Sequence, residues 1–238
     1  MTQIKTPNQN SLDHFFRGAF SIDMVLITFH NQKLKILLQE KKDLPGGKQL
    51  GLPGKLILPN EDTDEAIDNL MVSILGNAEF YKKQLRAFSE LDRHPLGRII
   101  TFAYYGLIPF KKIDKNIFEE LHWADFDNMP KLSLDHNHIL NEVFKRFKKG
   151  LNRHPLVFQL LPEKFILSDI TTIYEKAFNQ KLDLPNFRKR ILNGGLVAPS
   201  GEFKKSEKGY GRPAELYMQS NITQKAPVRN QIHFQFSA

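Results

Sequence analysis

Residues 52–76 have the sequence LPGKLILPNEDTDEAIDNLMVSILG, and this stretch decides how the first half of the chain folds. It begins in a Gly- and Pro-rich run that extends back to Leu44 and is typical of a loop. An acidic run follows at residues 61–65, and the next apolar residues lie three or four positions apart: Ala66, Ile67, Leu70, Met71 and Ile74. This spacing predicts an amphipathic helix with negative charge at its N-terminus, and Glu61 is expected at the helix start.

Runs of β-forming residues lie on both sides of this loop and helix. They predict strands at residues 22–29, 34–40, 83–88, 99–108 and 123–126. The first two flank His30-Asn31-Gln32-Lys33 and predict a hairpin, and a closing helix is expected over residues 139–147. Mixed strands and helices of this kind predict an α/β or α+β sandwich.

The composition excludes several classes of protein. Of 238 residues, 41% are hydrophobic and 25% are charged, which is typical of a folded globular chain and not of a disordered one. No apolar run approaches the ~20 residues that cross a bilayer, and the polar start lacks the apolar core of a secretory leader. The absence of cysteine excludes disulfides, thiolate metal sites and cysteine nucleophiles. We therefore expect a cytoplasmic protein of one large or two modest domains.

The net charge of +8 is unevenly distributed along the chain. Residues 1–150 carry 21 Lys or Arg and 19 Asp or Glu, a balance of +2, whereas residues 151–238 carry 13 and 7, a balance of +6. A basic segment beside a nearly neutral one favours attachment to a polyanion such as nucleic acid. The alternative interpretation is a solvated basic surface.

Residues 168–193 have the spacing of a helix-turn-helix. A first helix is expected to begin at Ser168, and Asp183 is expected to cap a second helix with Phe187, Ile191 and Leu192 turned inward. This arrangement projects Asn186, Arg188, Lys189 and Arg190 outward. Arg and Asn side chains are those that contact guanine and adenine in the major groove, and Lys pairs with phosphate.

A hairpin with a basic tip is expected after the second helix, at residues 196–218. A helix-turn-helix followed by such a hairpin is the winged helix arrangement. The basic and aromatic residues expected to contact DNA there are Lys204, Lys205, Lys208, Tyr210 and Arg212, with Arg212 placed in the minor groove or on phosphate.

The order of elements over residues 20–145, with Leu52-Pro53-Gly54 leading to Glu61 and a helix that ends at Gly76, resembles the Nudix hydrolase domain. The motif of that family falls here, without a gap, on Lys55, Glu61, Asn69, Leu70, Met71, Ser73, Ile74, Gly76 and Asn77, and only Glu61, Met71 and Gly76 obey it. In the family, helix carboxylates hold the Mg²⁺ that neutralises a diphosphate and activates water. Leu70, Ser73 and Ile74 stand at three of those positions, so we expect no catalytic residue, no metal site and no cofactor.

Residues 92–105 resemble the strand-turn-strand of the Nudix-related transcriptional regulators, in which the cleft takes nucleotides or sugars. The resemblance implies an effector site, with Arg93, Arg98, Tyr104 and Glu61 as its candidate residues. The structural alternative is an ion pair of Asp92 with either arginine, a core tyrosine and a helix-start glutamate. Two histidines, His136 and His138, follow Asp135, and we favour capping or packing over a metal site for them.

Residues 156–219, with Asn186-Phe187-Arg188-Lys189-Arg190 and Gly211-Arg212-Pro213-Ala214, resemble the DNA-binding half of the same regulators. The fold implied is α/β (α+β): a Nudix-type α/β/α sandwich with a mixed sheet, followed by a small winged helix-turn-helix domain. The boundaries expected are a flexible N-terminus at 1–18, a Nudix-like effector-binding and dimerisation domain at 19–150, a winged helix DNA-binding domain at 151–222, and a tail of unknown role at 223–238.

The function implied is transcription regulation by a sequence-specific homodimer, as a repressor on a palindromic double-stranded DNA operator. A small-molecule effector, either an ADP-ribose-like nucleotide diphosphate or a sugar derivative, would bind the degenerate Nudix domain. One alternative is a divergent Mg²⁺-dependent Nudix hydrolase of ADP-ribose or a nucleotide sugar, with metal held by substitutes such as Glu61 and Glu65. Another is a constitutive DNA-binding protein whose Nudix fold only dimerises.

Overall fold

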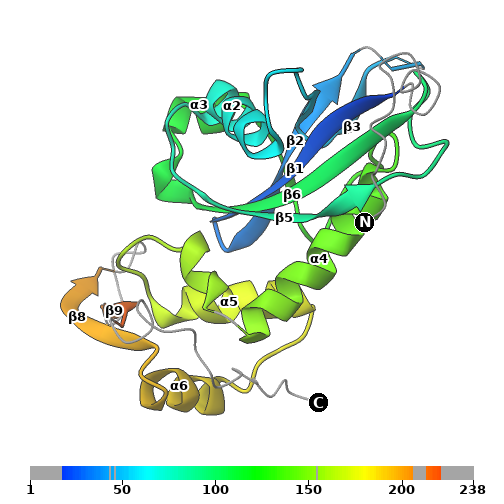
Figure 1. Ribbon diagram of the computed structural model, residues 1–238. Coiled ribbons are helices and arrows are strands. Elements are labelled where there is room, and N and C mark those ends of the chain that lie inside the picture. Colours follow the sequence, from blue (N-terminus) through cyan, green and yellow to red (C-terminus); the bar gives the residue numbers. More distant parts are fainter. Residues whose placement is uncertain (1–17, 43, 46, 154, 206–212, 221–238) are drawn as a thin grey trace, which may run out of the picture.

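A computed structural model describes residues 18–42, 44–45, 47–153, 155–205 and 213–220 of the chain (Figure 1). The first half is built on a seven-stranded sheet with the central order β3-β2-β1-β6-β5, in which β4 pairs with β1 and β7 pairs with β2. The strands are β1 (Ala19–His30), β2 (Lys33–Lys41), β3 (Gln49–Gly51), β4 (Gly54–Leu56), β5 (Tyr81–Phe88), β6 (Ile99–Pro109) and β7 (His122–Asp125). Because β1 and β6 run parallel and the other pairs antiparallel, the sheet is mixed, as predicted.

Helices cover both faces of this sheet. Helix α2 (Thr63–Leu75) and the short α3 (Lys115–Glu120) lie on one side, and α4 (His136–Arg153) lies on the other (Figure 1). Alternate β1 residues serve the two sides: Ile22, Met24 and Leu26 join the α2 core, whereas Val25 and Ile27 join the α4 core. A strand buried on both faces needs an unbroken apolar run, which residues 24–27 supply.

Local sequence explains the turn between β1 and β2 and the start of helix α2. The β1–β2 hairpin turns through Asn31 and Gln32, whose φ angles of 49° and 59° suit a tight two-residue turn. Helix α2 is capped by Asp62, which accepts hydrogen bonds from the Asp64 and Glu65 amides while Glu65 accepts one from the Asp62 amide. The expectation that Glu61 starts the helix is therefore wrong, because the capping box is centred on the next residue.

Two other expectations need correction. The Gly/Pro-rich run before α2 is not loop throughout, because its last part forms the short strands β3 and β4. The closing helix is longer than residues 139–147 and spans His136–Arg153.

The second half contains the predicted helix-turn-helix and hairpin. Its elements are the 3-10 helix η2 (Leu156–Leu160), α5 (Leu167–Phe178), α6 (Leu184–Asn193), β8 (Val197–Lys204) and β9 (Ala214–Gln219). The 3-10 helix η1 (Phe110–Lys112) belongs to the first half. Helix α5 begins at Leu167, one residue before the expected Ser168, and its N-cap residue Ile166 makes no side-chain cap. Asn179 ends α5 in the left-handed conformation, and Asp183 caps α6 as predicted.

One continuous hydrophobic core joins the two halves. Buried side chains of the sheet, α4, η2, α5, α6 and β9 belong to a single cluster, which includes Val25, Phe147, Leu160, Ile173 and Tyr217. Residue 150, at which a domain boundary is expected, lies inside α4, three residues before the end of that helix. The division into 19–150 and 151–222 stays a prediction about the chain, and the packing across it is extensive.

Polar contacts add to this joint between the halves. Gln32, in the β1–β2 turn, donates to Asp169 at 3.0 Å and accepts from Thr172 at 3.0 Å, both on α5. Lys176 of α5 binds Asp127, which follows β7, at 2.7 Å. The first helix of the helix-turn-helix is thus tied to the β1–β2–β7 end of the sheet.

No helix within the described ranges is long and apolar enough to cross a membrane.

Candidate functional site

Helix α6 presents a basic surface over an apolar base. Phe187 and Ile191 are 3% and 2% exposed and anchor the helix, while Arg188, Lys189 and Arg190 are exposed. Asp183 accepts a hydrogen bond from the Asn186 amide at 3.2 Å and so fixes the first turn. Asn186 itself is half-buried. The three cations therefore project from one rigid helix, as the sequence predicts.

Strand β9 contacts this helix through Arg188. Its Nη2 donates to the Tyr217 hydroxyl at 3.4 Å, and that hydroxyl in turn donates to the Glu215 carboxylate. The Glu215 bond, followed by burial, raises the pKa of Tyr217. Tyr217 also pairs through its backbone with Phe165, so Arg188 is held by a residue that is fixed to the body of the second half.

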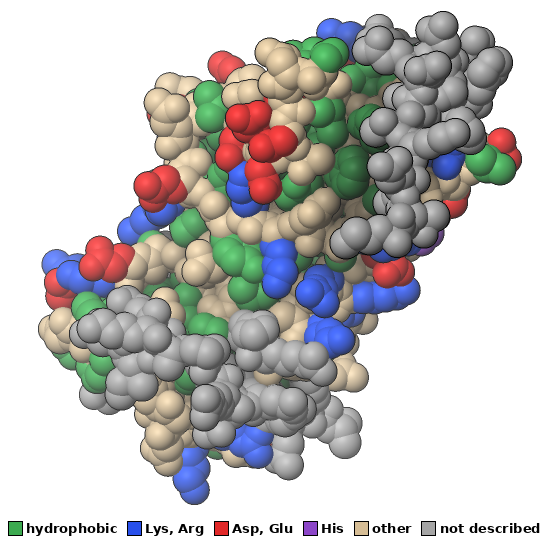
Figure 2. Space-filling model, viewed as in Figure 1, with side chains coloured by type: hydrophobic (Ala, Val, Ile, Leu, Met, Phe, Trp, Pro, Cys, Tyr) green, Lys and Arg blue, Asp and Glu red, His purple; other side chains and the backbone are tan. Residues whose placement is uncertain are grey.

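The hairpin of β8 and β9 forms the expected wing, and Lys204 and Lys205 are exposed at its end. Lys208, Tyr210 and Arg212, which are also expected to contact DNA, lie outside the described residues. Figure 2 shows acidic side chains over α2 and Lys or Arg side chains over α6, at opposite ends of one face. The charge distribution favours approach of a polyanion at the α6 end.

A cavity of about 520 Å³ opens in the first half at the end of β2, beside β4 and the turn before β6. Its cationic lining residues are Lys41, Lys42, Lys55 and Arg93, and its acidic ones are Asp23 and Glu40. Burial lowers the pKa of the Lys41 ammonium, and the charge of Asp23 opposes this effect. The excess of cations suits an anionic ligand.

A buried polar network forms one wall of this cavity. Arg93, 6% exposed, donates from Nε and Nη2 to the two oxygens of Asp135 at 3.0 and 2.9 Å, and its Nη2 lies 3.5 Å from Asp23. Thr101 donates to Asp23 at 2.8 Å. Arg93 is thus a fixed part of the wall, and its fork of donors is largely used within the chain.

His136 completes the same network. Its Nδ1 accepts from the Leu52 amide at 2.9 Å, which leaves Nε2 to carry the proton, 3.5 Å from Asp23. Burial acts to raise the pKa of Asp23, but the hydrogen bonds from His136 and Thr101 outweigh it, and the net shift is downward. His138 instead packs edge-on against Phe88, with the ring centroids 5.4 Å apart.

Glu61 is bound to Lys55 at the edge of the cavity. The Lys55 ammonium donates to both carboxylate oxygens at 2.7 and 2.8 Å, and Asn69 donates at 2.8 Å. The Lys55 bond first, and then the Asn69 bond, lower the pKa of Glu61 from 4.5 to about 2 against the effect of burial. Glu61 is therefore a carboxylate at any physiological pH.

This shift predicts a pH dependence of stability. The folded state of Glu61 binds a proton less readily than the unfolded state, so its contribution is fully present above pH 4.5 and is lost as the pH falls toward 2. The difference in free energy of unfolding between wild type and Glu61→Gln is expected to shrink over that interval. Urea unfolding of both proteins at several pH values measures it, and a difference that stays constant down to pH 2 would contradict the assignment.

The structure does not bring the other two candidate effector residues into the cavity. Tyr104 is 2% exposed in the α2 core, where its hydroxyl donates to Thr63 at 2.9 Å. Arg98 donates to the Ser89 and Glu90 carbonyls at 2.6 and 3.2 Å. The alternative of an Asp92 ion pair with Arg93 or Arg98 is also wrong, because both arginines have other partners. Of the four candidates, Arg93 lines the cavity and Glu61 contacts its lining residue Lys55.

The residues around α2 do not fit a Mg²⁺ site. Leu70 is 7% exposed, Ser73 donates to the Leu70 carbonyl, and the nearby carboxylates have partners in the chain: Glu65 in the capping box and Asp68 with Lys82 at 2.7 Å. Across the part of the chain that the structure describes, no group of three or more His, Asp or Glu is placed to hold a metal ion. A hard cation would lack the oxygen ligands it needs.

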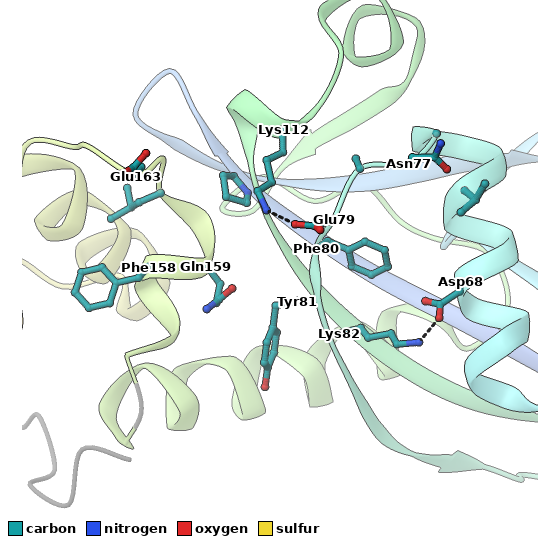
Figure 3. Close-up of a pocket in the computed structure, with 15 residues that line it drawn as sticks. Asp68, Asn77, Glu79, Phe80, Tyr81, Lys82, Lys112, Phe158, Gln159 and Glu163 are labelled. Carbon is teal, nitrogen blue, oxygen red and sulfur yellow. Dashed lines mark hydrogen bonds and ion pairs between the residues drawn. The ribbon is translucent and has the colours of Figure 1, made fainter. Parts of the chain in front are cut away.

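A larger cavity of about 820 Å³ lies between the two halves, where β5 and the end of α2 approach η2 (Figure 3). Its walls include Tyr81 from the first half and Phe158 and Gln159 from the second. The lysines here have acidic partners, Lys82 with Asp68 at 2.7 Å and Lys112 with Glu79 at 3.2 Å (Figure 3). Glu163 adds a further carboxylate to its lining, so this cavity lacks the excess of cations found in the cavity beside Lys55.

Comparison with known proteins bears on both halves. Residues 157–218 match the NrtR DNA-binding winged helix domain family. A repressor of Acinetobacter baylyi, named ADPR responsive transcriptional repressor NtrR, is 27% identical over 203 residues, which cover 83% of this chain and 80% of that protein. These matches support a Nudix-related regulator with a C-terminal winged helix.

Solved structures agree with this regulator fold. Shewanella oneidensis NrtR, in a complex with a 27mer DNA, superposes with a TM-score of 0.76 at 23% identity, over 90% of this chain and 99% of that one. A MutT/nudix family protein of Enterococcus faecalis superposes with a TM-score of 0.68 at 20% identity, over 91% and 95%. The predicted Nudix-type sandwich followed by a winged helix is therefore confirmed.

Several residues of the cavity could not be found by analysis of the sequence. Asp23 and Lys41 lie in or beside strands, and Lys55 stands where the Nudix motif has glycine. Besides Arg93, which the resemblance names, the charge of Lys55 at that glycine position is a feature of the sequence that points to the cavity.

Proposed function

We propose that the chain is a sequence-specific DNA-binding repressor whose Nudix domain binds ADP-ribose and thereby changes the affinity of the winged helix for operator DNA. The observation that carries the proposal is the pairing, in one chain, of a basic winged helix with a Nudix domain whose cationic cavity has no metal-binding cluster within the described residues. The relative in Acinetobacter baylyi is a repressor that responds to ADPR.

DNA contact is assigned to the exposed face of α6 and to the wing. We propose that Arg188 and Arg190 contact base edges, with Asn186 and Lys189 beside them, and that Lys204 and Lys205 bind phosphate. One winged helix contacts few base pairs, so we expect two copies of the chain on a palindromic operator. Analytical ultracentrifugation with and without operator DNA measures this stoichiometry.

Effector binding is assigned to the 520 Å³ cavity beside Lys55. ADP-ribose carries a diphosphate, and the lining of this cavity supplies cations together with polar side chains of Asp23 and Gln39. We propose that bound ADP-ribose is not hydrolysed, because Leu70, Ser73 and Ile74 offer no carboxylate for a metal that would activate water. An archaeal relative, the ADP-ribose pyrophosphatase of Methanocaldococcus jannaschii, is 29% identical over 117 residues, 49% of this chain and 69% of that one.

The proposal is tested by selecting operator sequences from a random DNA library and titrating ADP-ribose into the complex. Fluorescence anisotropy is expected to show that ADP-ribose changes the operator Kd by about 5- to 150-fold, the usual range of allosteric coupling. Chromatography after incubation with Mg²⁺ is expected to recover ADP-ribose intact. Equal affinity for selected and scrambled DNA would refute sequence-specific DNA binding, and release of AMP would favour the hydrolase.

The recognition helix is tested by Arg188→Ala and Arg190→Ala. Each is expected to weaken operator binding by ~1–3 kcal/mol if the arginine contacts a base. Lys181→Ala is a suitable control, since Lys181 is an exposed cation in the turn before α6 and is bound to Glu175 at 3.1 Å. Unchanged operator affinity in both arginine variants would remove the assignment of α6.

A further inference from the structure

We propose that the Lys55 ammonium, anchored by Glu61, binds the diphosphate of the effector and makes a divalent metal ion unnecessary for that binding. This inference rests on the proposed function, because it takes ADP-ribose as the ligand of the cavity. It assigns the diphosphate to a particular side chain of this chain, at a position where the Nudix motif has glycine.

Geometry shows that Glu61 has no capacity left for a metal ion. Its oxygens receive the two Lys55 bonds of 2.7 and 2.8 Å, the Asn69 bond of 2.8 Å and a longer bond of 3.3 Å from the Leu58 amide. Its side chain is only 6% exposed. A carboxylate so enclosed serves to hold the lysine in place.

Lys55 faces the ligand space. It follows Gly54 in β4, its side chain is 28% exposed, and it lines the cavity. An ammonium group has three N–H donors, and two of them suffice for the two Glu61 oxygens. The third remains for a phosphate oxygen, and because Glu61 fixes the group, little side-chain entropy is lost when the ligand binds.

The remaining charges of the cavity are compatible with this role. Arg93 and Asp135 neutralise each other, Asp23 is bound by Thr101 and faces Arg93 and His136, and Glu40 lies 3.3 Å from Lys48. Lys41 and Lys42 line the same space as Lys55. The three lysines that line this space thus provide the compensation that a diphosphate otherwise takes from a hard cation.

Calorimetric titration of the full chain with ADP-ribose tests the inference. The wild type is expected to bind with the same Kd in EDTA and in Mg²⁺. Lys55→Met is expected to bind about 10- to 100-fold more weakly, the effect of losing one charge-assisted hydrogen bond. Lys115→Met removes an exposed lysine of α3 that does not line the cavity and is expected to match the wild type.

A double variant keeps the test valid if Lys55→Met folds poorly. Lys55→Met with Glu61→Gln leaves no unpaired carboxylate and is expected to show the same loss of affinity. The inference is overturned if the wild type binds ADP-ribose only with Mg²⁺. It is also overturned if Lys55→Met and the double variant both bind ADP-ribose as tightly as the wild type. Those results leave the proposed function standing, whereas a wild type that binds no ADP-ribose under either condition overturns the proposed effector as well.

Discussion

Replacing Arg93 by methionine is expected to lower the free energy of unfolding by ~3–5 kcal/mol, the usual result of removing one partner from a buried ion pair. Arg93 is 6% exposed and holds Asp135 through two bonds of 2.9 and 3.0 Å, while Asp23 lies 3.5 Å away. Without the guanidinium, these carboxylates face one another in a site with little access to water. Urea unfolding followed by circular dichroism measures the loss.

A second variant separates the ion pair from simple packing. Arg93→Met with Asp135→Asn removes both charges, and much of the lost stability is expected to return because no carboxylate is left without its partner. If the double variant is as unstable as the single one, the loss comes from packing of the Arg93 side chain and not from the uncompensated charge.

Replacing Phe147 by alanine is expected to cost ~3–5 kcal/mol, as for other fully buried aromatic residues. Phe147 is 0% exposed on α4, in the core that joins both halves, and α4 contacts β5, η2 and α5. The loss is therefore expected to destabilise the Nudix half and the winged helix half together, in one transition.

Two probes distinguish this joint loss from a local one. Fluorescence of Trp123, the single tryptophan, reports on the Nudix half, and amide exchange in α5 and α6 reports on the winged helix half. Both are expected to shift equally in urea. Leu184→Ala, at a side chain that is 55% exposed, is the control and is expected to change stability by less than ~0.5 kcal/mol. Separate midpoints for the two probes would show that the halves unfold independently.

Much of the fold follows from local pattern. The β1–β2 turn, the strand runs and the apolar spacing of α2 are each set by residues close together in the chain. The prediction for Glu61 failed because acidic residues 61–65 offer several caps, and only the reciprocal bonds of Asp62 and Glu65 identify the one that is used. The extent of α4 was missed because its last turn depends on packing against η2: a Cβ on Gly150 would lie 2.4 Å from Leu156.

The basic face of α6 could be predicted, since helical spacing alone separates Phe187 and Ile191 from the cations. The cavity could not, because its partners are distant in sequence. Arg93 meets Asp135 across 42 positions, and Asp23 meets Thr101 across 78. The burial of Tyr104 could not be predicted either. A strand residue can point to either face of the sheet, and Tyr104 is buried because α2 packs on the face to which it points.

The continuous core between the halves bears on attempts to build chimeric biosensors from this chain. A cut at residue 150 would divide helix α4. It would also expose Leu151, Leu156 and Leu160, which are all buried in the intact chain. The isolated winged helix half would then have an exposed apolar surface that favours aggregation. A winged helix half that is transferred together with α4 and η2 keeps the residues of these helices that pack against it. The new sensor domain must then supply an apolar surface that fits the face of α4 and η2 left by the original sheet.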